Sequence, residues 1–195
     1  LAKVHFGEAL SFQRMVEALI QNRSITALNL SHNDIGFEDN RGSTTHRPES
    51  EGTSTNALSK LIGDWKCRLC YLDLSSNLLT APVGGMIGGA LRKNNSLVTL
   101  NLSHNGLKEG AAELCMSLKH NAALSHLDLG FNRIPAHTAF TISQLVRENE
   151  TLRRLGLNGS LLGRIGSIAL LGLCAERGGG SLTIDMQLAN TDQRM

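Results

Sequence analysis

The residues in this sequence with the widest chemical range are its cysteines. Cys67 and Cys70 form a CxxC pair, a spacing found in zinc sites. Cys115 and Cys174 stand alone, and neither a second CxxC nor a pair of spaced histidines is present to complete a zinc site. We therefore expect reduced, structural thiols and no metal ion.

Three of the seven histidines, His32, His104 and His126, fall inside a recurring sequence pattern and are expected on one surface. Three imidazoles on one surface can bind a metal ion. The pattern spaces these three across separate strands and two columns, with no acidic ligand in register. Contact with a protein partner is the favoured interpretation, and metal binding is the alternative.

The glycine-rich motifs complete neither a membrane site nor a phosphate site. The paired glycines in "VGGMIGGAL" (83–91) resemble a GxxxG motif but lie in no apolar run long enough to cross a bilayer, so they predict close helix packing. "RGGGS" (177–181) has no GK[ST] after it and predicts a helix C-cap followed by a turn. Because HExxH, GxSxG and EF-hand patterns are also missing from the sequence, we predict no enzymatic activity and no cofactor.

Charge and composition narrow the range of partners. Lys and Arg together number 19 against 17 Asp and Glu, and the basic residues form no cluster able to follow a phosphate backbone, so nucleic acid is not expected. The sequence has no run of eighteen apolar residues, so no membrane span is predicted. Reduced thiols, together with sequons that would place glycans on the predicted binding surface, favour a cytoplasmic location.

These residues are positioned by an internal repeat with the template LxxLxLxxNxL. Five copies occupy residues 25–35, 69–79, 97–107, 124–134 and 152–162. At the asparagine position they carry Asn33, Asn77, Asn105, Asn132 and Ser160. The separations of 44, 28, 27 and 28 residues give a period near 28 with one long insertion. Repeats of this length predict a solenoid.

Each copy predicts a strand, a turn and a helix. The central LxL has the two-residue period of a strand, which sends both leucines to one face. The asparagine amide can bond the backbone groups that the following turn leaves unpaired, so we predict a structural role for it and for Ser160. Residues 8–22, 110–121 and 137–149 have the three-to-four spacing of amphipathic helices. Stacked units would form a parallel sheet inside a curve, with helices outside.

The template, its period of 27–28 and the LxLSxN wording resemble the ribonuclease-inhibitor-like subfamily of leucine-rich repeats, over residues 8–175. The resemblance implies an α/β leucine-rich-repeat solenoid shaped as a horseshoe. The subfamily includes ribonuclease inhibitor, the sensor arms of NOD-like receptors, the Ran GTPase-activating protein, tropomodulin caps and ciliary scaffolds. These proteins share no common chemistry, so the resemblance implies binding without naming a partner.

We expect residues 1–195 to form a single leucine-rich-repeat domain that belongs to a longer array, because the first helix closes a repeat whose strand is missing. The extra residues of the first interval fall in the polar segment 37–56, which predicts a loop. A tolerated insertion is favoured over a phosphorylatable docking segment. Alternating residues in 181–191 predict a final strand.

The outward strand positions and the strand exits form the predicted partner-binding surface. It comprises Tyr71, Asp73, Thr99, His104, His126, Asp128, Phe131 and Arg154. We predict a protein-interaction scaffold that uses the concave face and the strand-exit rim, while a solvated face without a ligand is the alternative for these residues. Two other functions stay open: a GTPase-activating protein of the Ran type, and an architectural component of a ciliary or cytoskeletal assembly.

Overall fold

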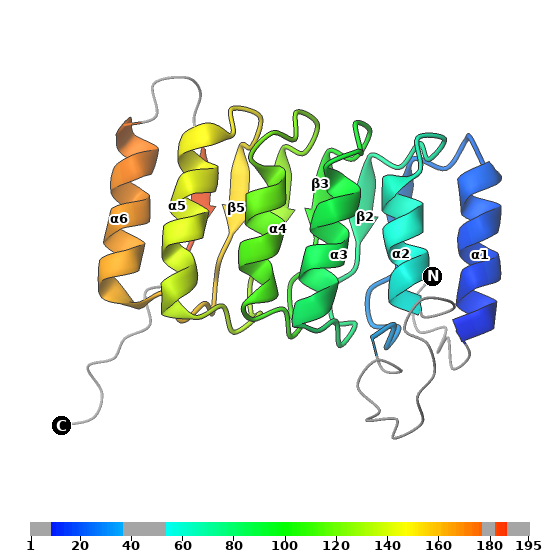
Figure 1. Cartoon of the computed structure of the whole chain (residues 1–195), viewed down its shortest axis with the longest axis horizontal. Helices are drawn as coiled ribbons and strands as arrows, with labels where there is room; N and C mark the ends of the chain where they lie inside the picture. The colour runs from blue at the N-terminus through cyan, green and yellow to red at the C-terminus, as the bar shows by residue number, and fades with distance from the viewer. Residues whose placement is uncertain (1–8, 37–53, 177–181, 187–195) are drawn as a thin grey trace.

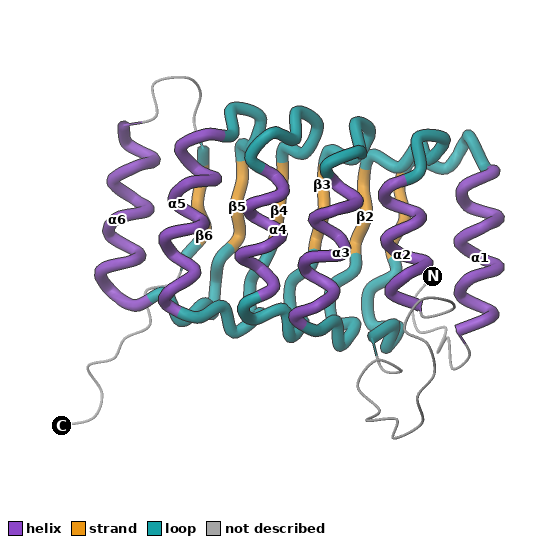
Figure 2. Tube along the Cα trace, in the orientation of Figure 1, coloured by secondary structure: helices purple, strands orange, loops and turns teal. Residues whose placement is uncertain are grey.

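The computed structural model of the chain describes residues 9–36, 54–176 and 182–186. Helices and strands alternate along this part of the chain (Figures 1 and 2). The helices are α1 (Ala9–Gln21), α2 (Ser54–Gly63), α3 (Ala81–Leu91), α4 (Gly110–Leu118), α5 (Ala139–Glu148) and α6 (Gly163–Glu176). The strands are β1 (Ala27–Asn29), β2 (Tyr71–Asp73), β3 (Thr99–Asn101), β4 (His126–Asp128), β5 (Arg154–Gly156) and β6 (Thr183–Asp185).

The strands form one parallel sheet in chain order, β1 to β6. Each strand pairs with the next without a shift, so that Leu28, Leu72, Leu100, Leu127, Leu155 and Ile184 lie in one row across the sheet. The helices form a second layer that covers one face of the sheet (Figure 1). The α/β solenoid expected from the repeat is confirmed.

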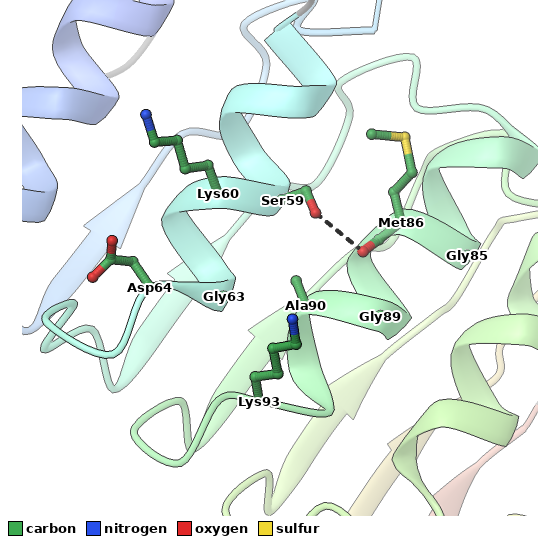
Figure 3. A pocket seen from close by; sticks show the side chains of 9 residues that line it. All are labelled: Ser59, Lys60, Gly63, Asp64, Gly85, Met86, Gly89, Ala90 and Lys93. Atoms are coloured by element: carbon green, nitrogen blue, oxygen red, sulfur yellow. Dashed lines mark hydrogen bonds between the residues drawn. The ribbon is translucent and has the colours of Figure 1, made fainter. Parts of the chain in front are cut away.

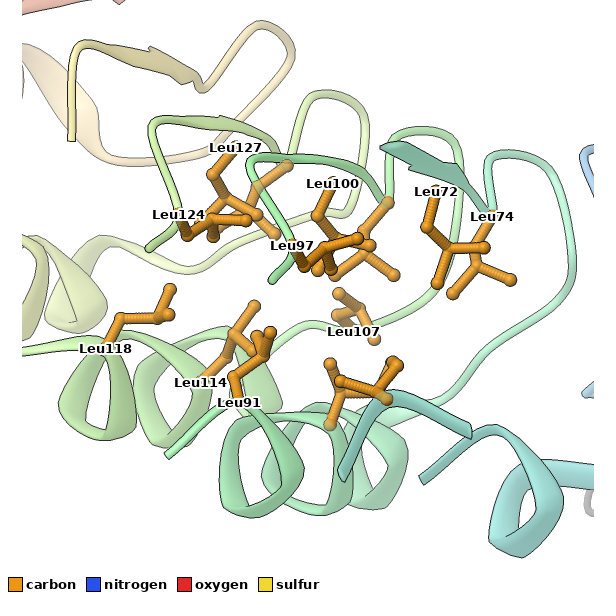
Figure 4. Close-up of a cluster of buried hydrophobic side chains, with 14 of the residues drawn as sticks. Leu72, Leu74, Leu91, Leu97, Leu100, Leu107, Leu114, Leu118, Leu124 and Leu127 are labelled. Carbon is orange, nitrogen blue, oxygen red and sulfur yellow. The ribbon is translucent and has the colours of Figure 1, made fainter. Parts of the chain in front are cut away.

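The core lies between these two layers. The row of central strand leucines is buried, as are the leucines that follow two residues later in each copy, such as Leu74 and Leu102. Leu91, Leu114 and Leu118 meet them from the helix side (Figure 4). Each buried leucine contributes about 1.5–3 kcal/mol, and each repeat shares its leucines with both neighbours. Stacking therefore supplies the burial that one repeat lacks.

The element boundaries differ in detail from those expected. The helix predicted in 137–149 starts with a 3-10 turn, Ala136–Thr138, and continues as α5. The predicted loop 37–56 is too long, because Ser54 and Thr55 already lie buried in the first turn of α2. The rest of that insertion and the 177–181 glycine segment lie outside the described residues. The strand expected in 181–191 is β6, and it extends the sheet beyond β5.

The glycines of α3 permit close packing of α3 against α4, as predicted. A Cβ atom at Gly84 would clash with the backbone of Gly110, and one at Gly110 would clash with the backbone of Ala81. On the solvent side, a Cβ atom at Gly89 would meet nothing within 4 Å. None of the described helices combines the length and the apolar character that a membrane span requires.

Candidate functional site

The sheet face that points away from the helices, here called the concave face, presents the outward strand residues in columns. Packed helices need about 8–10 Å between their axes and paired strands about 4.8 Å, so the sheet takes the inner side of the curve. The first column is Ala27, Tyr71, Thr99, His126, Arg154 and Thr183, which are direct register partners. Four residues predicted for partner binding therefore lie in a single row.

The middle of the concave face is hollowed by about 260 Å3. The hollow is lined by Tyr71, Thr99, Leu100, Asn101, His126, Leu127, Asp128, Arg154 and Gly156. Five of the predicted binding residues thus share one depression that spans β2 to β5. It combines an aromatic ring, an imidazole and charges of both signs, a mixture that suits a protein surface better than an apolar small molecule.

The second column, immediately after the central leucines, has a structural task that the sequence interpretation missed. The side-chain Oδ1 atoms of its Asn and Asp residues accept hydrogen bonds from the backbone N–H two residues later. The pairs are Asn29 with Ser31, Asp73 with Ser75, Asn101 with Ser103 and Asp128 with Gly130, at 2.8–3.0 Å. This is an Asx turn, which ends each of the strands β1 to β4. Asp73 is only 8% exposed, so it offers a partner little surface.

Acidic neighbours affect two of the predicted anchors, Arg154 and Tyr71. Arg154 Nε donates to Asp185 Oδ2 at 2.7 Å, and the two side chains are 62% and 32% exposed. An exposed ion pair of this kind contributes about 0–1 kcal/mol, so its main effect is to orient the guanidinium over the face. Desolvation, followed by the charge of Asp73, raises the pKa of the Tyr71 hydroxyl. Tyr71 is therefore a neutral hydrogen-bonding group at physiological pH.

The turns that follow β2, β3 and β4 form the strand-exit rim, along the lower edge of the array in Figure 1. The rings of His104 and Phe131, from consecutive turns, stack with their centroids 4.4 Å apart and an interplanar angle of 13°. Both residues were predicted for partner binding, and both are exposed. A hollow of about 670 Å3 lies beside them. The sequence interpretation did not include Leu78, Lys108 and Arg133, which also line this hollow.

The turn asparagines bond the backbone of their own repeat and of the repeat before. Asn77 Oδ1 accepts from the backbone N–H of Asn33 at 2.9 Å, and its Nδ2 donates to Leu30 O at 2.8 Å. Asn105 and Asn132 make equivalent bonds to the preceding copies. Ser160 departs from this arrangement, because its Oγ is buried without a hydrogen-bond partner.

A second asparagine series lies at the opposite edge of the array, where helices lead into strands. Asn149 Nδ2 donates to Leu118 O and Asn121 O, and Asn121 Nδ2 donates to Leu91 O and Asn94 O, at 2.7–3.1 Å. From the sequence alone, Asn94 and Asn149 stand out only as parts of Asn-X-Ser/Thr sequons. Their separation from Asn121 by the repeat period was the signal that identifies them as structural.

A further hollow, of about 520 Å3, lies on the helix side between α2 and α3 (Figure 3). Lys60 and Lys93 flank it, and Ser59 Oγ donates to Met86 O at 3.3 Å across it. Four of its nine lining residues are glycine or alanine, and Asp64 and Met86 complete the lining. Within the residues that the structure describes, no three His, Cys, Asp or Glu side chains come close enough together to hold a metal ion.

Comparison with known sequences gives relatives of one kind. The sequence model of the family described as Leucine Rich repeat matches residues 21–38 and 93–115. The chain is 26% identical over 170 residues to NACHT, LRR and PYD domains-containing protein 3 of Bos taurus, covering 86% of this chain and 15% of that protein. It is 30% identical over 164 residues to protein 5 of the same series from Bos taurus, covering 83% and 14%. The chain thus spans about 15% of the length of these curated relatives.

Among solved structures, leiomodin-1 actin-binding site 2 has a similar fold. The TM-score is 0.64 at 18% identity, and the match covers 89% of this chain and 90% of that one. The TM-score shows a shared architecture, and an identity of 18% supports no conclusion beyond the fold.

Proposed function

Because the chain is a leucine-rich-repeat protein related to the repeats of the NACHT, LRR and PYD domains-containing proteins, we propose that it is a scaffold that binds a protein partner. The proposed surface is the concave face together with the strand-exit rim. The depression that gathers Tyr71, Thr99, His126, Asp128 and Arg154 from four successive strands carries this proposal. No single repeat supplies it, so a partner bound there would depend on the whole stack.

The chemistry of the depression supports protein recognition. Tyr71 and Arg154 belong to the residue types that dominate binding energy at protein interfaces, and the Asp185 carboxylate holds Arg154 in place before any partner arrives. We place the protein in the cytoplasm, where its buried Cys67 and Cys115 thiols would remain reduced.

The test is an affinity capture from cytosolic extract with three forms of the chain. One is unaltered, and one carries Tyr71→Ala, His126→Ala and Arg154→Ala. A matched control carries Lys60→Ala, Lys93→Ala and Met116→Ala on the helix side, where Met116 is exposed. We expect a partner that the unaltered chain and the control retain and the concave-face variant loses. Loss with the control alone would assign binding to the helices and would support an architectural role instead.

Purified actin belongs in the same experiment as a defined probe, since the solved structure of similar fold is an actin-binding site of leiomodin-1. Binding that the concave-face variant abolishes would name actin as a partner. Failure to bind would exclude actin as a partner. The capture from cytosolic extract would then decide the scaffold proposal.

A further inference from the structure

The strand-exit rim contains a groove between the turns that follow β2, β3 and β4. Its apolar part is formed by Leu78 and Phe131, which are 46% and 47% exposed, and by Pro82 at the start of α3. Its polar part is formed by His104, Lys108 and Arg133. Three repeats contribute to the groove, so the periodic order of the array fixes the distances between these side chains.

The backbone holds the groove residues in a conformation that side chains rarely adopt. Leu78, His104, Lys108, Phe131 and Arg133 all have φ between 45° and 59°. The left-handed region is unfavourable for residues with a Cβ atom, and glycine is the usual occupant of such turns. Core packing does not explain Leu78 and Phe131 there, because nearly half of each side chain faces solvent. His32, Asp34 and Ser76 have the same conformation in the equivalent turns outside the groove, so the repeated turn sets the direction in which the groove side chains leave the backbone.

Neighbouring backbone groups keep these turns in place. The N–H of Phe131 donates to Asn158 O at 2.6 Å, and the N–H of His104 donates to Gly130 O at 2.8 Å. The N–H of Lys108 donates to Asn132 O at 3.1 Å. The backbone of these three groove residues is therefore held by the following repeat before a partner binds, which limits the entropy lost on binding.

The groove is electropositive. Lys108 and Arg133 form no ion pair within residues 9–36, 54–176 and 182–186, and the acidic residue among the lining side chains is Glu109. The N-termini of α3 and α4 also begin at this rim, and the first turn of α3 has no acidic residue. The positive end of the α3 dipole therefore adds to the two free cations, whereas Glu109 at the N-cap of α4 and Glu113 in its first turn offset the dipole of α4.

We propose that the rim groove binds an extended acidic segment of a partner protein. The segment inserts one apolar side chain between Leu78 and Phe131 and places carboxylates beside Lys108 and Arg133. This assignment deepens the scaffold proposal and rests on it, because it names the chemistry of the partner at one part of the same surface.

The experiment measures peptide binding by fluorescence anisotropy. The probe is a fluorescein-labelled peptide of alternating Glu and Ser with one central Phe. Comparison peptides replace the Phe with Ser or every Glu with Lys. We expect binding of the first peptide alone, with affinity that falls as salt rises. Equal binding of the Lys peptide, or of the peptide without Phe, would overturn the proposal.

Two variants and a control connect the binding to the groove. One variant is Phe131→Ser, and the other is the double variant Lys108→Glu with Arg133→Glu. We expect each to lower the affinity for the peptide by about tenfold or more, as for hot-spot residues. The control, Arg92→Glu with Lys93→Glu, makes the same charge change after the C-terminus of α3, at the far end of that helix from the groove. An equal loss of peptide affinity with the control would show that the effect depends on net charge alone and would refute binding in the groove. Thermal melting confirms that each variant is folded.

The two proposals fail in different ways. If the concave-face variant loses a captured partner while no acidic peptide binds, the scaffold stands and the groove assignment falls. If the peptide binds through Phe131 and the concave-face variant retains every captured partner, the groove stands and the concave face is removed from the proposed surface.

Discussion

Replacement of Asn105 by alanine tests the role of the turn asparagines most directly. Asn105 Oδ1 accepts from the backbone N–H groups of Asn77 and Leu79 at 2.9 and 3.0 Å. Its Nδ2 donates to the carbonyl oxygens of Leu74 and Leu102 at 3.0 and 2.9 Å. Its Nδ2 also donates to Ser103 O at 3.2 Å, and the side chain is buried, so Asn105→Ala removes the partner of five backbone groups in two repeats at once.

The expected cost follows from these lost bonds. A buried polar group that loses its hydrogen-bond partner costs about 1–3 kcal/mol, so the two N–H groups alone account for about 2–6 kcal/mol. A water molecule in the space vacated by the amide would restore part of this. We therefore expect the free energy of unfolding to fall by about 3–4 kcal/mol, a large part of the stability of an ordinary domain.

The assay is urea unfolding followed by far-ultraviolet circular dichroism, with Asn101→Ala as the matched control. Asn101 lies four residues earlier in the same repeat, and its Oδ1 accepts from Ser103 N at 3.0 Å on the half-exposed concave face. Water replaces that bond easily, so the control should lose less than about 1 kcal/mol. If Asn105→Ala costs no more than Asn101→Ala, the cross-repeat bonds do not stabilise the array and the reasoning is wrong.

Two further predictions concern packing and pH. Gly84→Ala should lower the melting temperature because the new Cβ meets the backbone of Gly110, whereas Gly89→Ala, in open space on the same helix, should raise stability by about 1 kcal/mol; similar melting curves for the two variants would contradict the close approach. Burial raises the pKa of Cys115 to about 12 from the ordinary value of 9.0, so the folded chain keeps a proton that the unfolded chain loses. The free energy of unfolding is therefore unaffected by this thiol below pH 9. Above pH 9 it falls by up to about 1.4 kcal/mol per pH unit. Urea unfolding between pH 7 and 10 should therefore show a steeper alkaline decline for the unaltered chain than for Cys115→Ala, and parallel declines would refute the burial argument.

The sheet and its register could be predicted because burial acts on every repeat in the same way. The central leucines must all face the helices, and a one-residue shift would expose them. That requirement fixes the strand positions, and hence the row of Tyr71, Thr99, His126 and Arg154, from the sequence alone.

The details that the sequence did not reveal depend on local backbone geometry and on contacts between repeats. Nothing in a leucine or a phenylalanine indicates a left-handed backbone, so the groove around Leu78 and Phe131 became visible only in the structure. Asp73 is likewise buried at an outward strand position, although Asn29 and Asp128, which make the same Asx turn, are exposed. Asp185 lies outside the repeat template, and its bond to Arg154 follows from the additional strand pair between β5 and β6.

The amide bonds between repeats all point the same way along the chain. Asn77, Asn105 and Asn132 complete the turn of the copy that precedes them, and Asn121 and Asn149 do the same at the opposite edge. A repeat that loses its C-terminal neighbour therefore loses these side-chain partners of its own backbone groups, and its N-terminal neighbour supplies none of them. Ser160 omits this bond at the last turn. The junction between β4 and β5 therefore lacks the amide bonds that join the earlier turns, and we expect local unfolding of the described part of the array to begin there.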